Sequence, residues 1–92
     1  MTNYPKQGDI IWLNLEPRIG KEPTKRRPFL VLSNTKYNQK VGLIIGCPIT
    51  SVKKGYPFEV ELPSATKTKG VILSDHIKSL DFIAREFEFI EH

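Results

Sequence analysis

Residues 9–33 read DIIWLNLEPRIGKEPTKRRPFLVLS, and this stretch decides how the chain folds. Apolar residues dominate Asp9–Leu15 and Phe29–Ser33, which predicts two strands that are apolar on both faces, as in a barrel or sandwich. Between them, Glu16–Arg27 contains two prolines and a glycine, which predict a loop rather than a regular element. A long basic loop on a small β body commonly carries a binding or catalytic function.

The rest of the chain repeats this pattern of short apolar segments separated by turns. Further strands are predicted at Val41–Cys47, Phe58–Leu62, Gly70–Ser74 and Phe87–Glu91, and one helical turn at Asn34–Lys40, capped by Asn34 or Ser33. No segment keeps a helical period for three turns. Many short strands joined by Gly and Pro turns predict an all-β fold: a small, strongly bent barrel formed by residues 1–92 as one domain.

Composition narrows the class of protein. A hydrophobic content of 39% is enough for a compact globule and too high for a disordered tail. The one cysteine, Cys47, lies in an apolar run, which predicts a buried, inert thiol. The N-terminus lacks the apolar core of a signal peptide, and the longest apolar run, Val41–Ile49, is too short to cross a bilayer. We expect a cytoplasmic protein without a membrane segment.

Charge is unevenly distributed, although the net charge of +4 is modest. From residue 18 to residue 54 there are nine basic residues and one acid, Glu22. From Asp81 onward acids outnumber bases. A one-sided basic surface favours a polyanionic partner such as nucleic acid, although a solvated lysine-rich surface explains the charge equally well.

Few residues offer catalytic chemistry. The chain has no Cys/His spacing typical of zinc sites and no glycine loop for phosphates, so no metal or other cofactor is predicted. Arg27, fixed by Pro28, opens one predicted strand, and Thr50 follows another. If those strands are neighbours, the two side chains meet at one rim of the barrel. A surface ion pair for Arg27 and an ordinary β-branched position for Thr50 remain open on this reasoning.

Five motifs are spread over residues 8 to 85: Gly8–Trp12 (GDIIW), Glu22 with Arg27-Pro28, Cys47–Thr50 (CPIT), Gly55–Val60 (GYPFEV), and Gly70-Val71 with Asp75. In their order and with their gaps, these motifs resemble the MazF/PemK family of toxin endoribonucleases. The resemblance implies an SH3-like barrel, a homodimer, and metal-independent cleavage of single-stranded RNA in bacterial toxin–antitoxin systems. It also implies a cognate antitoxin whose acidic, disordered tail covers the RNA site. Family members commonly continue into a C-terminal helix, which this sequence, ending in IEH, does not show.

The resemblance also assigns roles to residues. Arg27 and Thr50 map to the catalytic pair, and Glu22 maps to a glutamate implicated in some members. Chemistry fits these roles, because a guanidinium and a hydroxyl stabilise the charge that gathers when a 2′-OH attacks the adjacent phosphorus. Glu22 is the candidate base for the 2′-OH proton. DNA lacks that hydroxyl, so the mechanism predicts specificity for RNA, with 2′,3′-cyclic phosphate and 5′-hydroxyl ends.

Candidate RNA-binding residues are basic, aromatic or polar side chains near these positions: Lys21, Lys25, Arg26, Ser51, Lys53, Lys54, Tyr56 and Asp75. Trp12 and Phe58 are expected in the core. One position departs from PemK-like members, which carry an active-site arginine two residues before the aspartate. Here that position is Leu73, so a role of Asp75 in stabilising a turn is an equal alternative.

Two other functions compete with the nuclease. One is a gyrase-inhibiting toxin resembling CcdB, which binds a protein and needs no catalytic set of arginine, threonine and glutamate. The other is a non-enzymatic SH3-like module that binds RNA or a peptide. Cleavage of naked single-stranded RNA in the presence of a chelator separates the nuclease from both alternatives.

Overall fold

The computed structural model describes residues 4–15 and 26–92 of the chain. These residues form seven antiparallel strands, one short α-helix and one 3₁₀ turn. In chain order they are β1 (Ile10–Asn14), β2 (Arg26–Val31), α1 (Thr35–Val41), β3 (Leu43–Thr50), β4 (Glu59–Glu61), β5 (Val71–Leu73), η1 (Ser74–His76), β6 (Lys78–Asp81) and β7 (Glu88–Glu91). The predicted all-β fold with only short helical turns is confirmed.

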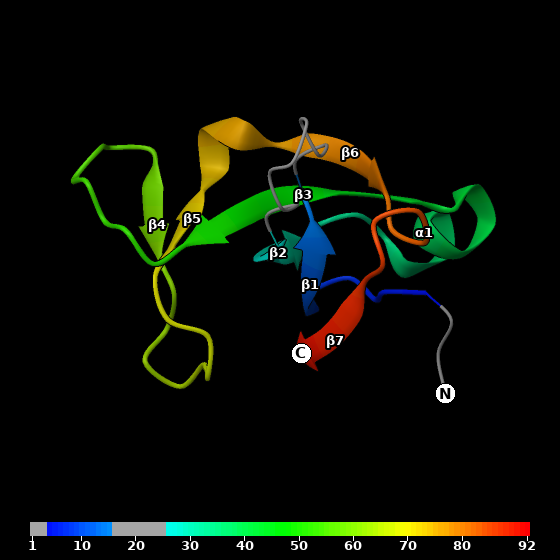
Figure 1. The fold of residues 1–92 in the computed structure, drawn as a ribbon, viewed down its shortest axis with the longest axis horizontal. Helices are drawn as coiled ribbons and strands as arrows, with labels where there is room; N and C mark the ends of the chain where they lie inside the picture. The colour runs from blue at the N-terminus through cyan, green and yellow to red at the C-terminus, as the bar shows by residue number, and fades with distance from the viewer. Residues whose placement is uncertain (1–3, 16–25) are drawn as a thin grey trace, which may run out of the picture.

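Strand β3 is the centre of the sheet, whose strand order is β4-β5-β3-β2-β1-β7 with β6 also paired to β3. It runs across the molecule from the end near α1 to the end near β4 and β5 (Figure 1). One edge of β3 pairs with β2. Along the other edge Leu43–Gly46 pair with β6, and Ile49 and Thr50 pair with β5. This change of partner lets the sheet bend around its core.

Alternating side chains of the central strands form the hydrophobic core. Ile11, Leu13, Phe29, Val31 and Ile44 are fully buried. Successive side chains of a strand point to opposite faces, so the buried residues of β1 and β2, spaced two apart, share one face of the sheet. The core is therefore built mainly on one face of β1, β2 and β3.

Trp12 lies between two core residues of β1 but points to the other face, where it is 38% exposed. The expectation that Trp12 belongs to the core is wrong, because Ile11 and Leu13 take the buried face and strand geometry turns the residue between them outward. Phe58 is only half-buried, so it is not a core residue either.

Helix α1 sets where β3 begins. Asn34 is its N-cap, with a side-chain oxygen that accepts a hydrogen bond from the Lys36 N–H at 2.8 Å. The helix ends at Gly42, whose φ of 78° is left-handed. The strand predicted from Val41 therefore begins two residues later, at Leu43, and continues to Thr50.

The described residues contain no helix long and apolar enough to cross a membrane.

The structure differs from the sequence-based expectation at the start of β2 and at β6. Arg26 and Arg27 belong to strand β2 and not to the preceding loop, because they pair with Asn14 and Leu13 of β1. Strand β6 was not predicted, since Leu80 is the one buried residue among its four. The rest of the predicted loop, including the candidates Lys21, Glu22 and Lys25, lies outside the described residues.

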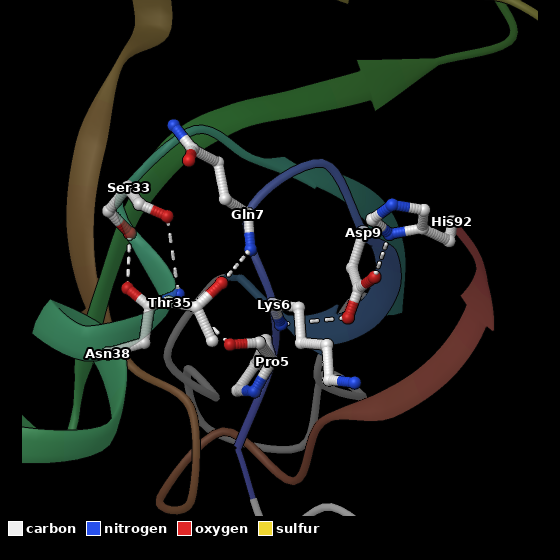
Figure 2. A network of polar contacts seen from close by, with 8 residues as sticks. All are labelled: Pro5, Lys6, Gln7, Asp9, Ser33, Thr35, Asn38 and His92. Atoms are coloured by element: carbon white, nitrogen blue, oxygen red, sulfur yellow. Dashed lines mark hydrogen bonds and ion pairs between the residues drawn. The ribbon is translucent and has the colours of Figure 1, made fainter.

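A polar network ties the first described residues to α1 and to the last residue (Figure 2). Asp9 is 4% exposed, and its carboxylate accepts a hydrogen bond from the Lys6 N–H and contacts Nδ1 of His92, both at 2.8 Å. Nδ2 of the buried Asn38 donates to the Pro5 carbonyl at 3.0 Å. The buried polar groups thereby gain the partners that their removal from water requires.

Gly46 is expected to tolerate no side chain. A Cβ there would lie 2.0 Å from the Leu30 carbonyl oxygen and 2.7 Å from the ring of Phe29. Gly46→Ala should therefore separate β2 from β3 and lower the free energy of unfolding by about 3 kcal/mol, measured by urea denaturation. Gly42→Ala is the matched control. It meets no atom within 4 Å but has a positive φ, so it should cost only about 1 kcal/mol. Equal costs would contradict the close approach of β2 and β3.

The Cys47 thiol is expected to resist modification in the folded protein. It is 2% exposed, which confirms the predicted burial. Burial raises the pKa of the thiol, and the nearby charge of Asp75 raises it further, against the opposing effect of Lys78. Because the thiolate is the reactive form, labelling by a disulfide reagent at neutral pH should be slow in the native protein and fast in denaturing urea. Equal labelling rates would contradict a buried, protonated thiol.

Candidate active site

The pairing of β2 with β3 brings the two predicted catalytic side chains together. Phe29 pairs with Pro48, and Leu30 and Val31 continue the same antiparallel register. Extended two residues in the other direction, this register places Arg27 opposite Thr50. Nη1 of Arg27 lies 3.4 Å from Oγ1 of Thr50, a long hydrogen bond. The prediction that these two groups meet at the ends of neighbouring strands is confirmed.

Arg27 lies on the core face of β2, at the end where that face opens to solvent. It is two residues from the buried Phe29 and pairs with the buried Leu13 of β1. Its guanidinium is half-buried and reaches Thr50 from within the sheet. A strand position fixes such a side chain more firmly than an irregular loop does, which favours a site that must hold a phosphate in one place.

Arg26 points to the opposite face, where it is partly exposed and bonds to β1 and to the segment that includes β7. Its guanidinium donates to Asn14 Oδ1 at 3.0 Å, to the Glu86 carbonyl at 2.8 Å and to Glu88 Oε1 at 2.9 Å. These bonds tie β2 to β1 and β7. The two neighbouring arginines therefore have different surroundings, and an RNA contact by Arg26 stays a prediction.

The hydroxyl of Thr50 accepts two hydrogen bonds within the protein. One comes from Arg27, and the other comes from the Val52 N–H at 3.2 Å. A threonine hydroxyl has two acceptor lone pairs and one donor hydrogen. With both lone pairs engaged, its O–H remains to donate to a third group, as a stabiliser of developing negative charge must do.

Two surface grooves meet at Arg27 and Thr50, since both residues line both grooves. The first groove has a volume of about 570 Å³, and its other lining residues include Trp12, Pro28, Ile49, Ser51, Lys67 and Lys69. The second has a volume of about 520 Å³, and its other lining residues include Lys54, Tyr56, Phe58, Glu59, His76 and Lys78. The Arg27–Thr50 pair thus forms the boundary between two depressions that are bordered by basic and aromatic side chains.

The predicted RNA-binding residues divide between these grooves. Arg26 and Ser51 line the first groove, and Lys54 and Tyr56 line the second. The Tyr56 ring stacks on Phe58 with 5.2 Å between centroids, and Tyr56 is about half exposed. An exposed ring that already stacks on a second ring is suited to stack against a base with its other face.

Three further positions complete the comparison with the sequence. Lys53 pairs with Glu61 at the surface, outside both grooves. Asp75 lies in η1, and its carboxylate is 3.6 Å from Nε2 of His76, which lines the second groove. Leu73 also lines that groove, so it adds apolar surface at the position where PemK-like members carry an arginine. RNA contacts by Lys53 and Asp75 stay predictions.

Some groove residues were missed by the reasoning from sequence. Trp12 was assigned to the core, although the alternation of β1 would have turned it outward. Lys67 and Lys69 lie between the predicted strands Phe58–Leu62 and Gly70–Ser74, and nothing local shows that this segment returns to Thr50. His76 ends an exposed 3₁₀ turn and Lys78 begins β6, and the apolar pattern revealed neither element.

Known proteins are similar to this chain over most of its length. Residues 6–92 match the model of a family described as PemK-like, MazF-like toxins of type II toxin–antitoxin systems. The endoribonuclease toxin MazF of Escherichia coli K12 is 44% identical over 81 residues, covering 88% of this chain and 72% of that protein. Endoribonuclease MazF9 of Mycobacterium tuberculosis H37Rv is 32% identical over 87 residues, covering 88% and 74%.

Solved structures give the same result. A MazE–MazF crystal structure from Deinococcus radiodurans (form II) superposes with a TM-score of 0.89 at 48% identity, covering 96% of this chain and 79% of that chain. The crystal structure of MazF from the same organism (form I) gives 0.87 at 46% identity, covering 99% and 83%. The chain therefore belongs to the MazF/PemK family of toxin endoribonucleases of type II toxin–antitoxin systems.

Proposed function

We propose that this toxin cuts single-stranded RNA at specific sequences without a metal ion. In this mechanism the 2′-OH of one nucleotide attacks the adjacent phosphorus, the bond to the 5′-oxygen breaks, and the products carry a 2′,3′-cyclic phosphate and a 5′-hydroxyl. The observation that supports it best is the meeting of the Arg27 guanidinium and the Thr50 hydroxyl where two grooves join.

Arg27 supplies the positive charge of the reaction. As the 2′-oxygen attacks, negative charge increases on the phosphoryl oxygens, and a guanidinium can donate two parallel hydrogen bonds to them. A guanidinium has donors only and no lone pair available to accept a proton, so Arg27 acts as an electrostatic group and not as the base. Because its position is fixed by strand β2, little reorganisation is needed as charge develops.

Thr50 supplies a neutral donor to the same phosphoryl oxygens. Its lone pairs accept bonds from Arg27 and Val52, so the hydroxyl hydrogen is directed toward the groove. One donor of this kind typically lowers the barrier by about 3 kcal/mol, roughly a hundredfold or more in rate. Glu22, in the segment outside the described residues, is the proposed base for the 2′-OH proton.

The RNA would run across the Arg27–Thr50 boundary and occupy both grooves. On the side of the second groove, Tyr56 offers a ring for a base, and Lys54 offers charge for the backbone. Lys21 and Lys25, with Arg26, Ser51, Lys53 and Asp75, remain proposed RNA contacts. Side chains lining the grooves would determine the recognition sequence, since they can be exchanged without changing the fold.

The assembly belongs to the same proposal. The MazF of Deinococcus radiodurans crystallises with MazE, and we propose that this toxin also binds a cognate antitoxin, whose acidic tail covers the basic grooves. A homodimer is proposed as well. Strand β7 ends the sheet, and its Phe89 is 61% exposed, which supports burial against a second copy.

Substitution of the central pair should abolish cleavage without unfolding the protein. Arg27→Ala removes the charge, and Arg27→Lys keeps the charge but loses the planar two-donor fork, so both should cut a defined RNA at least about a hundredfold more slowly in EDTA. Thr50→Ala should show a similar loss, and Thr50→Ser should recover most of the rate because it restores the hydroxyl. Circular dichroism should show wild-type folding for all four variants.

The controls use the same RNA and end-group analysis of its fragments. Lys36→Ala, on α1 and outside both grooves, should cleave like the wild type. A folded Arg27→Ala protein that keeps most of the wild-type rate would remove Arg27 from the mechanism. Fragments with 5′-phosphate ends would exclude attack by the 2′-OH.

A further inference from the structure

The residues between β4 and β5 bring two lysines to the first groove. Lys67 and Lys69 both line it together with Arg27 and Thr50. Neither lysine takes part in the four ion pairs found among the described residues. Both lysines are exposed and bring positive charge to the groove that holds the proposed catalytic pair, and Nζ of Lys69 donates to the Thr66 carbonyl at 3.1 Å. We refer to Lys67–Lys69 as the lysine segment.

The lysine segment ends directly against Thr50. Gly70 follows it with a φ of 125°, and a Cβ at Gly70 would lie 2.2 Å from the Thr50 carbonyl oxygen. Only a glycine permits this approach of the two backbones. At the same point Val71 pairs with Thr50 in the β3–β5 ladder. The lysine segment is thus positioned by the same strand that carries the catalytic threonine.

Glu91, on strand β7, fixes the other side of this segment. Its carboxylate accepts hydrogen bonds from the Lys67 N–H at 3.0 Å, the Thr68 N–H at 2.7 Å and the Thr68 hydroxyl at 2.7 Å. These bonds favour the ionised form and lower the pKa of Glu91 below its ordinary value of 4.5. The hydrogen bonds that the ionised Glu91 accepts from the lysine segment are therefore fully present above the ordinary pKa of 4.5 and are lost as the pH falls through the lowered pKa. A segment without strand pairing of its own is held in place from β7.

We propose that the lysine segment binds RNA phosphates next to the scissile one and that Glu91 is a positioning residue that holds it in the groove. This inference rests on the proposed function and adds a binding site for the RNA backbone on one side of the cleaved bond. The surface of the groove favours RNA over an acidic peptide as the occupant. Trp12 lines it beside the lysines, and an exposed indole is suited to stack a base.

The test measures binding separately from cleavage. Trp12 is the one tryptophan of the chain and lines the groove, so its fluorescence should change when RNA binds. The probe is an oligonucleotide that spans a mapped cut site and carries 2′-fluoro in place of each 2′-OH, which prevents cleavage. The double variant Lys67→Ala/Lys69→Ala should bind it more weakly, with a slope of log affinity against log salt that is shallower by about 1.4. Lys36→Ala is the matched control and should keep the wild-type slope.

A double-mutant cycle tests the role of Glu91. Glu91→Gln loses the charge and one acceptor oxygen, so it should raise KM for cleavable RNA several-fold and leave kcat near the wild-type value. In the Lys67→Ala/Lys69→Ala background the same substitution should have no further effect, since Glu91 acts through those lysines. An equal effect of Glu91→Gln in both backgrounds would show a general structural role and overturn the positioning inference.

The outcomes distinguish this inference from the proposed function. A wild-type protein that cuts no RNA in EDTA contradicts the proposed function, whatever the lysines do. If the wild-type protein cuts RNA and the Lys67→Ala/Lys69→Ala variant keeps the full salt slope, only the proposed role of the lysine segment is overturned. The proposed role of the lysine segment is also overturned if the double variant loses affinity for a polyglutamate peptide but binds the oligonucleotide as the wild type does.

Discussion

The close antiparallel pairing of β2 with β3 is the constraint on which the site depends. Gly46 lets the two backbones approach, because a Cβ there would enter the Leu30 carbonyl. The register set by Phe29 and Pro48 then carries forward to Arg27 and Thr50. A shift by one residue would turn either side chain to the other face of its strand and separate the guanidinium from the hydroxyl. Packing in the core therefore decides the geometry at the rim.

Strand alternation also gives two adjacent arginines different roles. Arg27 points along the core face to Thr50, whereas Arg26 bonds to Asn14 and Glu88 on the other side. Arg26 therefore stabilises the junction of β1, β2 and β7 and borders the first groove, whereas Arg27 borders both grooves. The same alternation turns Trp12 into the first groove between two buried neighbours. A strand that forms the core thus also supplies surface to the site.

Local patterns predicted much of this fold but not all of the site. Apolar runs located six of the seven described strands, and Asn34 was one of two residues predicted to cap the helical turn. The match of motifs identified Arg27 and Thr50, and their meeting required only that two strands be neighbours. The attachment of Glu91 to Lys67 and Thr68 was not predicted, because these contacts join residues 23 to 24 positions apart. Strand β6 was missed because a single buried leucine gives no period.

The most direct test of the mechanism removes one 2′-hydroxyl group from the substrate. An RNA with a single mapped cut site is compared, in EDTA, with the same RNA carrying 2′-deoxyribose only at the nucleotide before that site. Attack by the 2′-OH predicts that the substituted RNA still binds, stays uncut at that position and inhibits cleavage of the unsubstituted RNA competitively. Cleavage of the substituted RNA at the same position would contradict the account, because the nucleophile would then have to come from elsewhere.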